Sequence, residues 1–152
     1  MVRRFDRETV SGFVNLQTYL QPEGVEVLTV SGTVSLIAYR EIKAVCFVRE
    51  FLPDNPADER KAFATRPKKD GLWVRLQFRD GDSIEALVAN NLLLVEGAGL
   101  TISPPDPYSN TQRMFVPRAA LTDVQVLGVV GSPLRRRETK PAAKPGQLEM
   151  FD

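Results

Sequence analysis

Short apolar segments separated by turn-forming residues run through most of this sequence, and their length and period favour an all-β fold. In the clearest segment, residues 72–78, an apolar side chain recurs at every second position, as on one face of a strand. The residues of that face are Leu72, Val74, Leu76 and Phe78. The pair Asp80-Gly81 follows, a strong signal for a tight hairpin turn, and leads into a mostly apolar segment at 83–88. We therefore predict a β-hairpin over residues 72–88.

Similar segments predict further strands along the chain. They lie at residues 10–14, 25–30, 34–39, 42–48, 92–95, 100–102, 113–116 and 121–130. The polar pair Arg40-Glu41 interrupts two apolar runs, which predicts a one-turn 3₁₀ corner between two strands. Cys46 lies in the second of these runs and is predicted to be a buried structural thiol.

The two halves of the chain are predicted to be copies of each other. Aligned pairs are Val10 with Ile84, Gly24 with Gly99, and Ile42 with Leu121. Apolar residues fall on apolar residues along the aligned segments, with one longer loop at 104–112 in the second half. Chance similarity between two β-rich segments is the alternative, and the agreement of two segments with one insertion favours duplication.

A pair of small β units with a tail is the predicted organisation. The segments are a first β-barrel repeat at 1–49, a connecting segment at 50–70, a second β-barrel repeat at 71–130 and a tail at 131–152. Each repeat has the strand number, and the size of roughly 50–60 residues, of a small SH3-like or Sm-like barrel. The predicted fold class is all-β, with two related barrel repeats packed together and a disordered C-terminal tail.

The second half resembles the Sm-like family of small barrels. The resemblance lies in the Asp80-Gly81 turn, the apolar segment 84–88, the run Asn90-Asn91-Leu92-Leu93, and the pair Phe115-Val116 with 121–126. RNA sites of that family resemble an Asp/Asn loop with an Arg-Gly pair. Asn90 and Asn91 match the loop, whereas neither half contains Arg-Gly, so the resemblance leaves RNA binding by that route unsupported.

Two side chains common in catalytic and metal sites, histidine and cysteine, are missing or nearly missing from this sequence. It has no histidine, which excludes Ser-His-Asp and Cys-His arrangements and histidine-ligated metals. Cys46 is the only cysteine, which excludes an intramolecular disulfide and a multi-cysteine metal site. We therefore expect no enzyme activity, no catalytic residue, no cofactor and no metal.

The sequence also lacks the features of a membrane protein. Its longest apolar runs fall far short of the roughly 20 residues of a membrane helix, and the first residues have no apolar stretch of signal-peptide type. A cytoplasmic protein with no membrane contact is expected. With 20 Lys and Arg against 19 Asp and Glu, any polyanion partner would need a local basic patch.

A protein partner is predicted from the C-terminal tail. Its composition is basic and lacks hydrophobic period, which is typical of a disordered segment. The apolar cluster Gln147-Leu148-Glu149-Met150-Phe151 near its end resembles the pentapeptide with which bacterial replication and mismatch-repair factors bind the sliding clamp. That resemblance implies a hydrogen bond from Gln147 at the pocket rim and a shallow subsite for Leu148. Met150 and Phe151 would fill the deep apolar subsite.

Other interpretations of the tail stay open. One is a tail that docks on its own barrels. Another is weak, salt-sensitive and non-specific nucleic-acid binding. The residues for that alternative are Arg135, Arg136, Arg137, Lys140 and Lys144 in the tail, with Trp73 and Arg75 in the body. Trp73 is equally interpretable as a packing residue that meets the other half.

The long loop 104–112 is the one place in the body where a polar cluster suggests a ligand. Together with the residue that follows it, the loop supplies Asp106, Asn110 and Arg113. The same residue types are also common in ordinary hairpin loops, so both interpretations stay open. As a whole, the chain resembles an uncharacterised bacterial family of β-rich proteins with a similar tail, which implies no particular activity.

Overall fold

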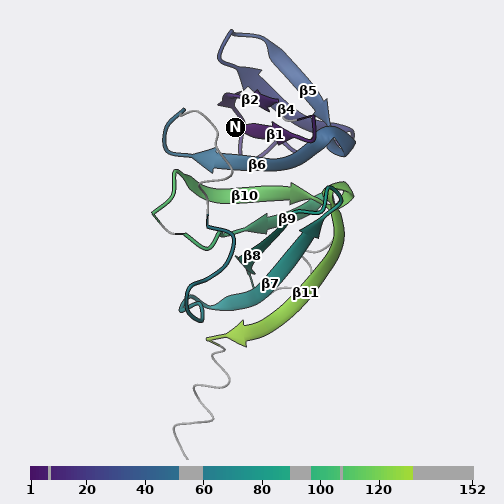
Figure 1. The fold of residues 1–152 in the computed structure, drawn as a ribbon. Helices are drawn as coiled ribbons and strands as arrows, with labels where there is room; N and C mark the ends of the chain where they lie inside the picture. The colour runs from purple at the N-terminus through teal and green to yellow at the C-terminus, as the bar shows by residue number, and fades with distance from the viewer. Residues whose placement is uncertain (7, 52–59, 90–96, 107, 132–152) are drawn as a thin grey trace, which may run out of the picture.

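The computed structural model describes residues 1–6, 8–51, 60–89, 97–106 and 108–131. The strands are β1 (Val2–Arg4), β2 (Thr9–Val10), β3 (Gly12–Phe13), β4 (Gly24–Thr29), β5 (Val34–Ala38), β6 (Ile42–Val48), β7 (Gly71–Phe78), β8 (Ser83–Val88), β9 (Gly99–Ile102), β10 (Thr111–Pro117) and β11 (Leu121–Val130). Two 3₁₀ turns, η1 (Tyr39–Glu41) and η4 (Arg118–Ala120), are the helical elements of the described residues. The predicted all-β fold class is thus confirmed (Figure 1). The predicted strand at 92–95 lies outside the described residues.

The strands form three antiparallel sheets. The largest has the order β2-β1-β6-β10-β9, and the others have the orders β11-β7-β8 and β3-β4-β5. Strand β6 belongs to the first half and β10 to the second, so their pairing joins the halves in one continuous sheet (Figure 1). We call this β6–β10 pairing the seam. Within the described residues none of the sheets closes on itself, so the closed barrels stay a prediction.

Both halves have the same order of neighbouring strands and the same pairing register. The first half has β6-β1-β2 and β3-β4-β5, and the second has β11-β7-β8 and β9-β10, with a bridge from Leu87 to Ser103 between β8 and the end of β9. Residues aligned from the sequence occupy equivalent places. Val2 pairs with Val10 and Val45 as Leu76 pairs with Ile84 and Val124, and Glu26 pairs with Leu36 as Thr101 pairs with Phe115. This agreement is what duplication predicts.

Glycine begins both β4 and β9 because a neighbouring strand approaches too closely there for a side chain. The neighbours are β5 and β10, each close to the point where it turns into its 3₁₀ corner. A Cβ atom on Gly24 would lie 2.0 Å from the carbonyl oxygen of Ile37, and one on Gly99 would lie 2.1 Å from that of Val116. Both distances are overlaps with backbone atoms, so a larger residue must push the strands apart.

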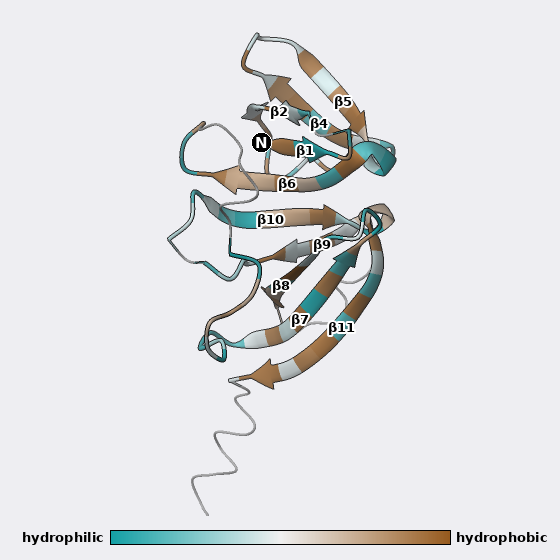
Figure 2. Cartoon of the chain, in the orientation of Figure 1, coloured by the Kyte–Doolittle hydropathy of each residue, from teal (hydrophilic) through white to brown (hydrophobic). Residues whose placement is uncertain are grey.

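Two hydrophobic cores lie on opposite faces of the seam, and each takes residues from both halves. Ala44 and Cys46 of β6 belong to the core of the second half, while Phe115 of β10 belongs to the core of the first. This exchange follows from the alternation of side chains along a strand. The middle of the molecule, along β6, most of β10 and β8, is accordingly apolar (Figure 2). Cys46 is 2% exposed, which confirms the predicted buried thiol.

We expect Gly24→Ala and Gly99→Ala each to lower the free energy of unfolding by about 2–3 kcal/mol, because the added methyl group overlaps a carbonyl oxygen of the next strand. Urea unfolding measures the effect. Gly128→Ala is the matched control: its added Cβ would meet the Trp73 ring at an ordinary 3.6 Å, so a small effect is expected. Equal losses in all three variants would contradict this account of the β4 and β9 glycines.

Candidate functional site

A basic cleft lies between the connecting segment and the loop that precedes β10. The cleft has a volume of about 460 Å³ and is lined mainly by residues 63–69 and 103–106, with contributions from Arg49, Arg60, Leu87, Thr111 and Gln112. The charged residues of the lining are Arg49, Arg60, Arg66, Lys68, Lys69 and Asp106. Five cations and a single carboxylate give this basic cleft a positive potential, even though the chain as a whole is nearly neutral.

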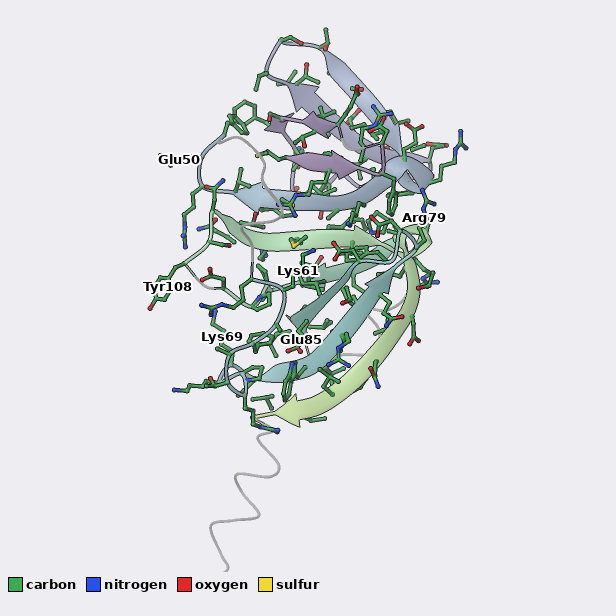
Figure 3. All side chains as sticks on the ribbon, in the orientation of Figure 1. Glu50, Lys61, Lys69, Arg79, Glu85 and Tyr108 are labelled. Carbon is green, nitrogen blue, oxygen red and sulfur yellow. The ribbon has the colours of Figure 1, made fainter. Side chains whose placement is uncertain are left out.

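Hydrogen bonds between the two residues that follow β6 and the loop fix one wall of the basic cleft. The Asn110 side chain accepts from the Glu50 amide at 3.0 Å and donates to the Glu50 carbonyl at 2.9 Å. Arg49 donates to the Ser109 carbonyl at 3.0 Å. Asn110, predicted as a candidate ligand residue, is therefore occupied in holding the loop. Tyr108 points away from the body, 89% exposed (Figure 3).

The other two candidates in the loop region differ in position. Asp106 lines the basic cleft and accepts a hydrogen bond from the amide of Tyr108 at 3.0 Å. Arg113 lies instead over the Phe47 ring, with its guanidinium carbon 5.6 Å from the ring centroid. The structure therefore brings one of the three predicted loop residues to the cleft.

Trp73 anchors the opposite wall. Its indole N–H donates to Glu85 at 3.1 Å, and its ring meets the Phe63 ring edge-on, with the centroids 6.3 Å apart. The Phe63 amide donates to the same Glu85 oxygen, and Arg66 lies over the indole at 5.9 Å. Trp73 thus packs, as one interpretation held, but against the connecting segment rather than the other half.

Arg75 lies beside this anchor and is half-exposed. It forms an ion pair with Glu85 at 3.6 Å and donates to the Gln125 side chain at 3.2 Å. Glu85 therefore connects the two body residues of the nucleic-acid alternative. In Figure 3, Glu85 is labelled on the strands, with Lys61 above it and Lys69 to its left, both on the connecting segment.

A second charged cluster ties the seam to the β7–β8 hairpin. Lys43 of β6 donates to Asp80 and Asp82 at 2.9 Å each, and Lys61 donates to Asp82 at 2.7 Å. Burial alone would raise the pKa values of both carboxyls, but their hydrogen bonds to these lysines hold both values below the usual range. Burial likewise lowers the pKa of Lys43, yet its two carboxylate partners raise it overall.

The remaining predicted site residues lie outside the described residues. These are Asn90, Asn91, Arg135, Arg136, Arg137, Lys140, Lys144, Gln147, Leu148, Met150 and Phe151. The described residues contain no group of three or more His, Cys, Asp or Glu able to hold a metal ion. No helix in that part of the chain is long and apolar enough to cross a membrane.

Comparison with known proteins assigns the chain to a family. Residues 1–128 match the sequence profile described as "Family of unknown function (DUF6982)". The chain belongs to this family. The DUF6982 match covers both halves and most of β11, and it ends before residues 147–151. Neither the curated proteins nor the solved structures give a significant match.

The sequence did not predict the cations of the basic cleft in this DUF6982 protein. The run Arg66-Pro67-Lys68-Lys69 was the available signal, because three of the five cations fall within it. Arg60 precedes this run within the connecting segment, whereas Arg49 directly follows β6 and reaches the cleft only through folding. The ion pairs of Asp80 and Asp82 were also missed, because aspartate is common in hairpin turns for backbone reasons.

We expect Lys43→Met to lower the free energy of unfolding at neutral pH by on the order of 1 kcal/mol, as for partly exposed ion pairs. The pKa values of Asp80 and Asp82 are lower in the folded chain than the ordinary value of 3.8. The ion pairs therefore stabilise the folded state fully above that pH, and this stabilisation is lost as the pH falls through the folded-state pKa values. Urea unfolding as a function of pH should therefore show a shallower acid limb in the variant. Lys69→Met, in the basic cleft, is the control; an unchanged acid limb in Lys43→Met would contradict the assignment.

Proposed function

We propose that this DUF6982 protein is a non-enzymatic interaction protein whose C-terminal peptide binds the bacterial sliding clamp. The observation that carries the proposal is the sequence Gln147-Leu148-Glu149-Met150-Phe151, which has the order of residue types found in clamp-binding pentapeptides. The lack of histidine and of a convergent catalytic motif in the sequence favours binding over chemistry. The clamp acts in the bacterial cytoplasm, which is also where the proposal places this protein.

In this proposal the halves are two copies of one SH3-like or Sm-like unit that holds a second partner. Their common strand order and pairing register support the common origin. The last described strand, β11, ends at the end of the molecule opposite β4 and β5 (Figure 1). A peptide that continues from that end starts well away from the first half, so the clamp and a second partner can bind together.

We expect a peptide of residues 140–152 to bind purified bacterial sliding clamp with micromolar affinity. Burial of Met150 and Phe151 contributes roughly 1.5–3 kcal/mol each, so Phe151→Ala should weaken binding by at least about tenfold. Lys144→Ala in the same peptide is the control and should bind as the parent does. The same two substitutions are then compared in the full chain by calorimetry.

Two outcomes would contradict clamp binding. One is no binding of the parent peptide at high micromolar concentration. The other is equal loss in the Phe151→Ala and Lys144→Ala peptides, which would assign the interaction to charge rather than to the apolar motif.

Nucleic-acid binding is the second candidate, and the basic cleft is the observation that favours it. Five cations line this one cleft, and Phe63 in the lining offers an apolar ring. The basic residues of the tail would add further phosphate contacts. Such binding is electrostatic, so it is expected to weaken steeply with salt and to show little sequence preference.

We expect the double variant Lys68→Gln/Lys69→Gln to bind a single-stranded oligonucleotide more weakly than the parent. Each lost phosphate contact should reduce the slope of log affinity against log salt by about 1. Arg40→Gln/Arg118→Gln removes the same charge from the 3₁₀ corners, away from the cleft, and serves as the matched control. Fluorescence anisotropy at several salt concentrations measures both, and equal slopes in the two variants would contradict a role for the cleft.

A further inference from the structure

The seam joins two different edges of the repeated unit. Strand β6 is the last strand of the first half, and β10 is the strand before the 3₁₀ corner of the second. Their equivalents in the other half are β11 and β5, because η1 aligns with η4. Both of these strands lie at sheet edges within the described residues. Within the described residues, β5 and β11 therefore each have one edge without a neighbouring strand. They are the equivalents of the two strands that pair at the seam.

The register of the seam assigns partners to these edges. At the seam, Phe115 pairs with Val45 and Arg113 with Phe47. The residues that correspond by alignment are Leu36 with Val124, and Val34 with Val126. All four are exposed apolar side chains: 52% for Leu36, 43% for Val124, 68% for Val34 and 58% for Val126. The seam register thus sets exposed apolar residues opposite each other, at positions that only a second chain can bring together.

On β11, the side chains that lie on the core-facing side of the second half's sheet are exposed. Val124 and Val126 pair with the buried residues Leu76 and Val74, so they lie on the core-facing side of their sheet. Val45, the equivalent of Val124 in the first half, is only 2% exposed because the seam covers it. This difference in exposure between equivalent valines arises because, among the described residues, no strand pairs with β11 on the side away from β7.

Both edges are poor in the charges and prolines with which monomeric proteins protect exposed strands, and β11 has two irregularities in its pairing with β7, at Leu121/Asp123 and Val126/Gly128. Strand β5 contains no charged residue and no proline, and β11 has one charged residue in ten, Asp123. Edges with few charges are templates for pairing with another chain.

We infer that β11 of one copy pairs antiparallel with β5 of a second copy, in the register of the seam. Leu36 then lies opposite Val124 and Val34 opposite Val126, which covers the exposed side of the second core as Phe115 covers the first. Because the two edges differ, the contact is head-to-tail. It leaves one edge free on each terminal copy, so association proceeds to a ring or an open chain of copies.

The test uses the full-length chain and light scattering coupled to size exclusion across the micromolar range. The parent chain should associate with increasing concentration. Val34→Lys, on β5, and Val126→Lys, on β11, should each weaken association by at least about tenfold, because a lysine would be placed within the apolar contact. Val30→Lys is the matched control: Val30 is 64% exposed, lies just outside β4 and β5, and should associate as the parent does.

Mixing the two defective variants tests the head-to-tail geometry. The Val34→Lys chain keeps an intact β11, and the Val126→Lys chain keeps an intact β5, so the mixture should form dimers and nothing larger. Circular dichroism and thermal unfolding confirm that each variant is folded.

Three results would overturn the inference. A parent chain that stays monomeric at every concentration is the first. Loss of association in Val126→Lys but not in Val34→Lys is the second, since β11 would then take another strand, such as one from the tail. Loss in Val30→Lys as large as in the other variants is the third, since general surface hydrophobicity would then drive association.

Discussion

The antiparallel pairing of β6 with β10 is the contact on which both halves of the molecule depend. Units of roughly 50–60 residues bury only a limited fraction of their surface when they fold alone. Pairing at the seam lets each half bury further apolar side chains against the other. Phe115 crosses from the second half to the first core, where burial of its ring contributes roughly 1.5–3 kcal/mol. Ala44 and Cys46 cross in the opposite direction. Neither core is complete without the seam, so the halves are not independent domains.

The strands and the internal alignment could be predicted because they depend on local sequence. A period of two residues sets the buried face of β7, and the Asp80-Gly81 pair sets its hairpin with β8. The alignment of Gly24 with Gly99 is matched by the same backbone approach in both halves. The seam could not be predicted in this way. Backbone hydrogen bonds between edge strands depend little on which residues form them. The sequence therefore did not indicate which edge of one half pairs with which edge of the other.

The candidate site was less predictable because it is made by chain segments without strand period. Residues 60–69 cross β7 and β8 to contact Trp73 and Glu85, a path that no hydrophobic pattern indicated. The cations of the basic cleft become neighbours only through that path. The second charged cluster was not predicted either, because aspartate residues are common in tight turns. Asp80 was explained by its place in the hairpin, whereas the fold also uses it to hold Lys43 of the other half.

The residues of β6 and of its equivalent β11 differ according to whether another strand covers them. At the seam the residues of β6 that face the second core are small and apolar, Ala44 and Cys46. The equivalent positions of β11 hold Asp123 and Gln125, both exposed. Removing a carboxylate such as Asp123 from water without a partner is costly, so this face of β11 must stay hydrated when another strand pairs beside it. A contact between copies therefore has one apolar face where the seam has two, and it is weaker and more readily reversible than the seam.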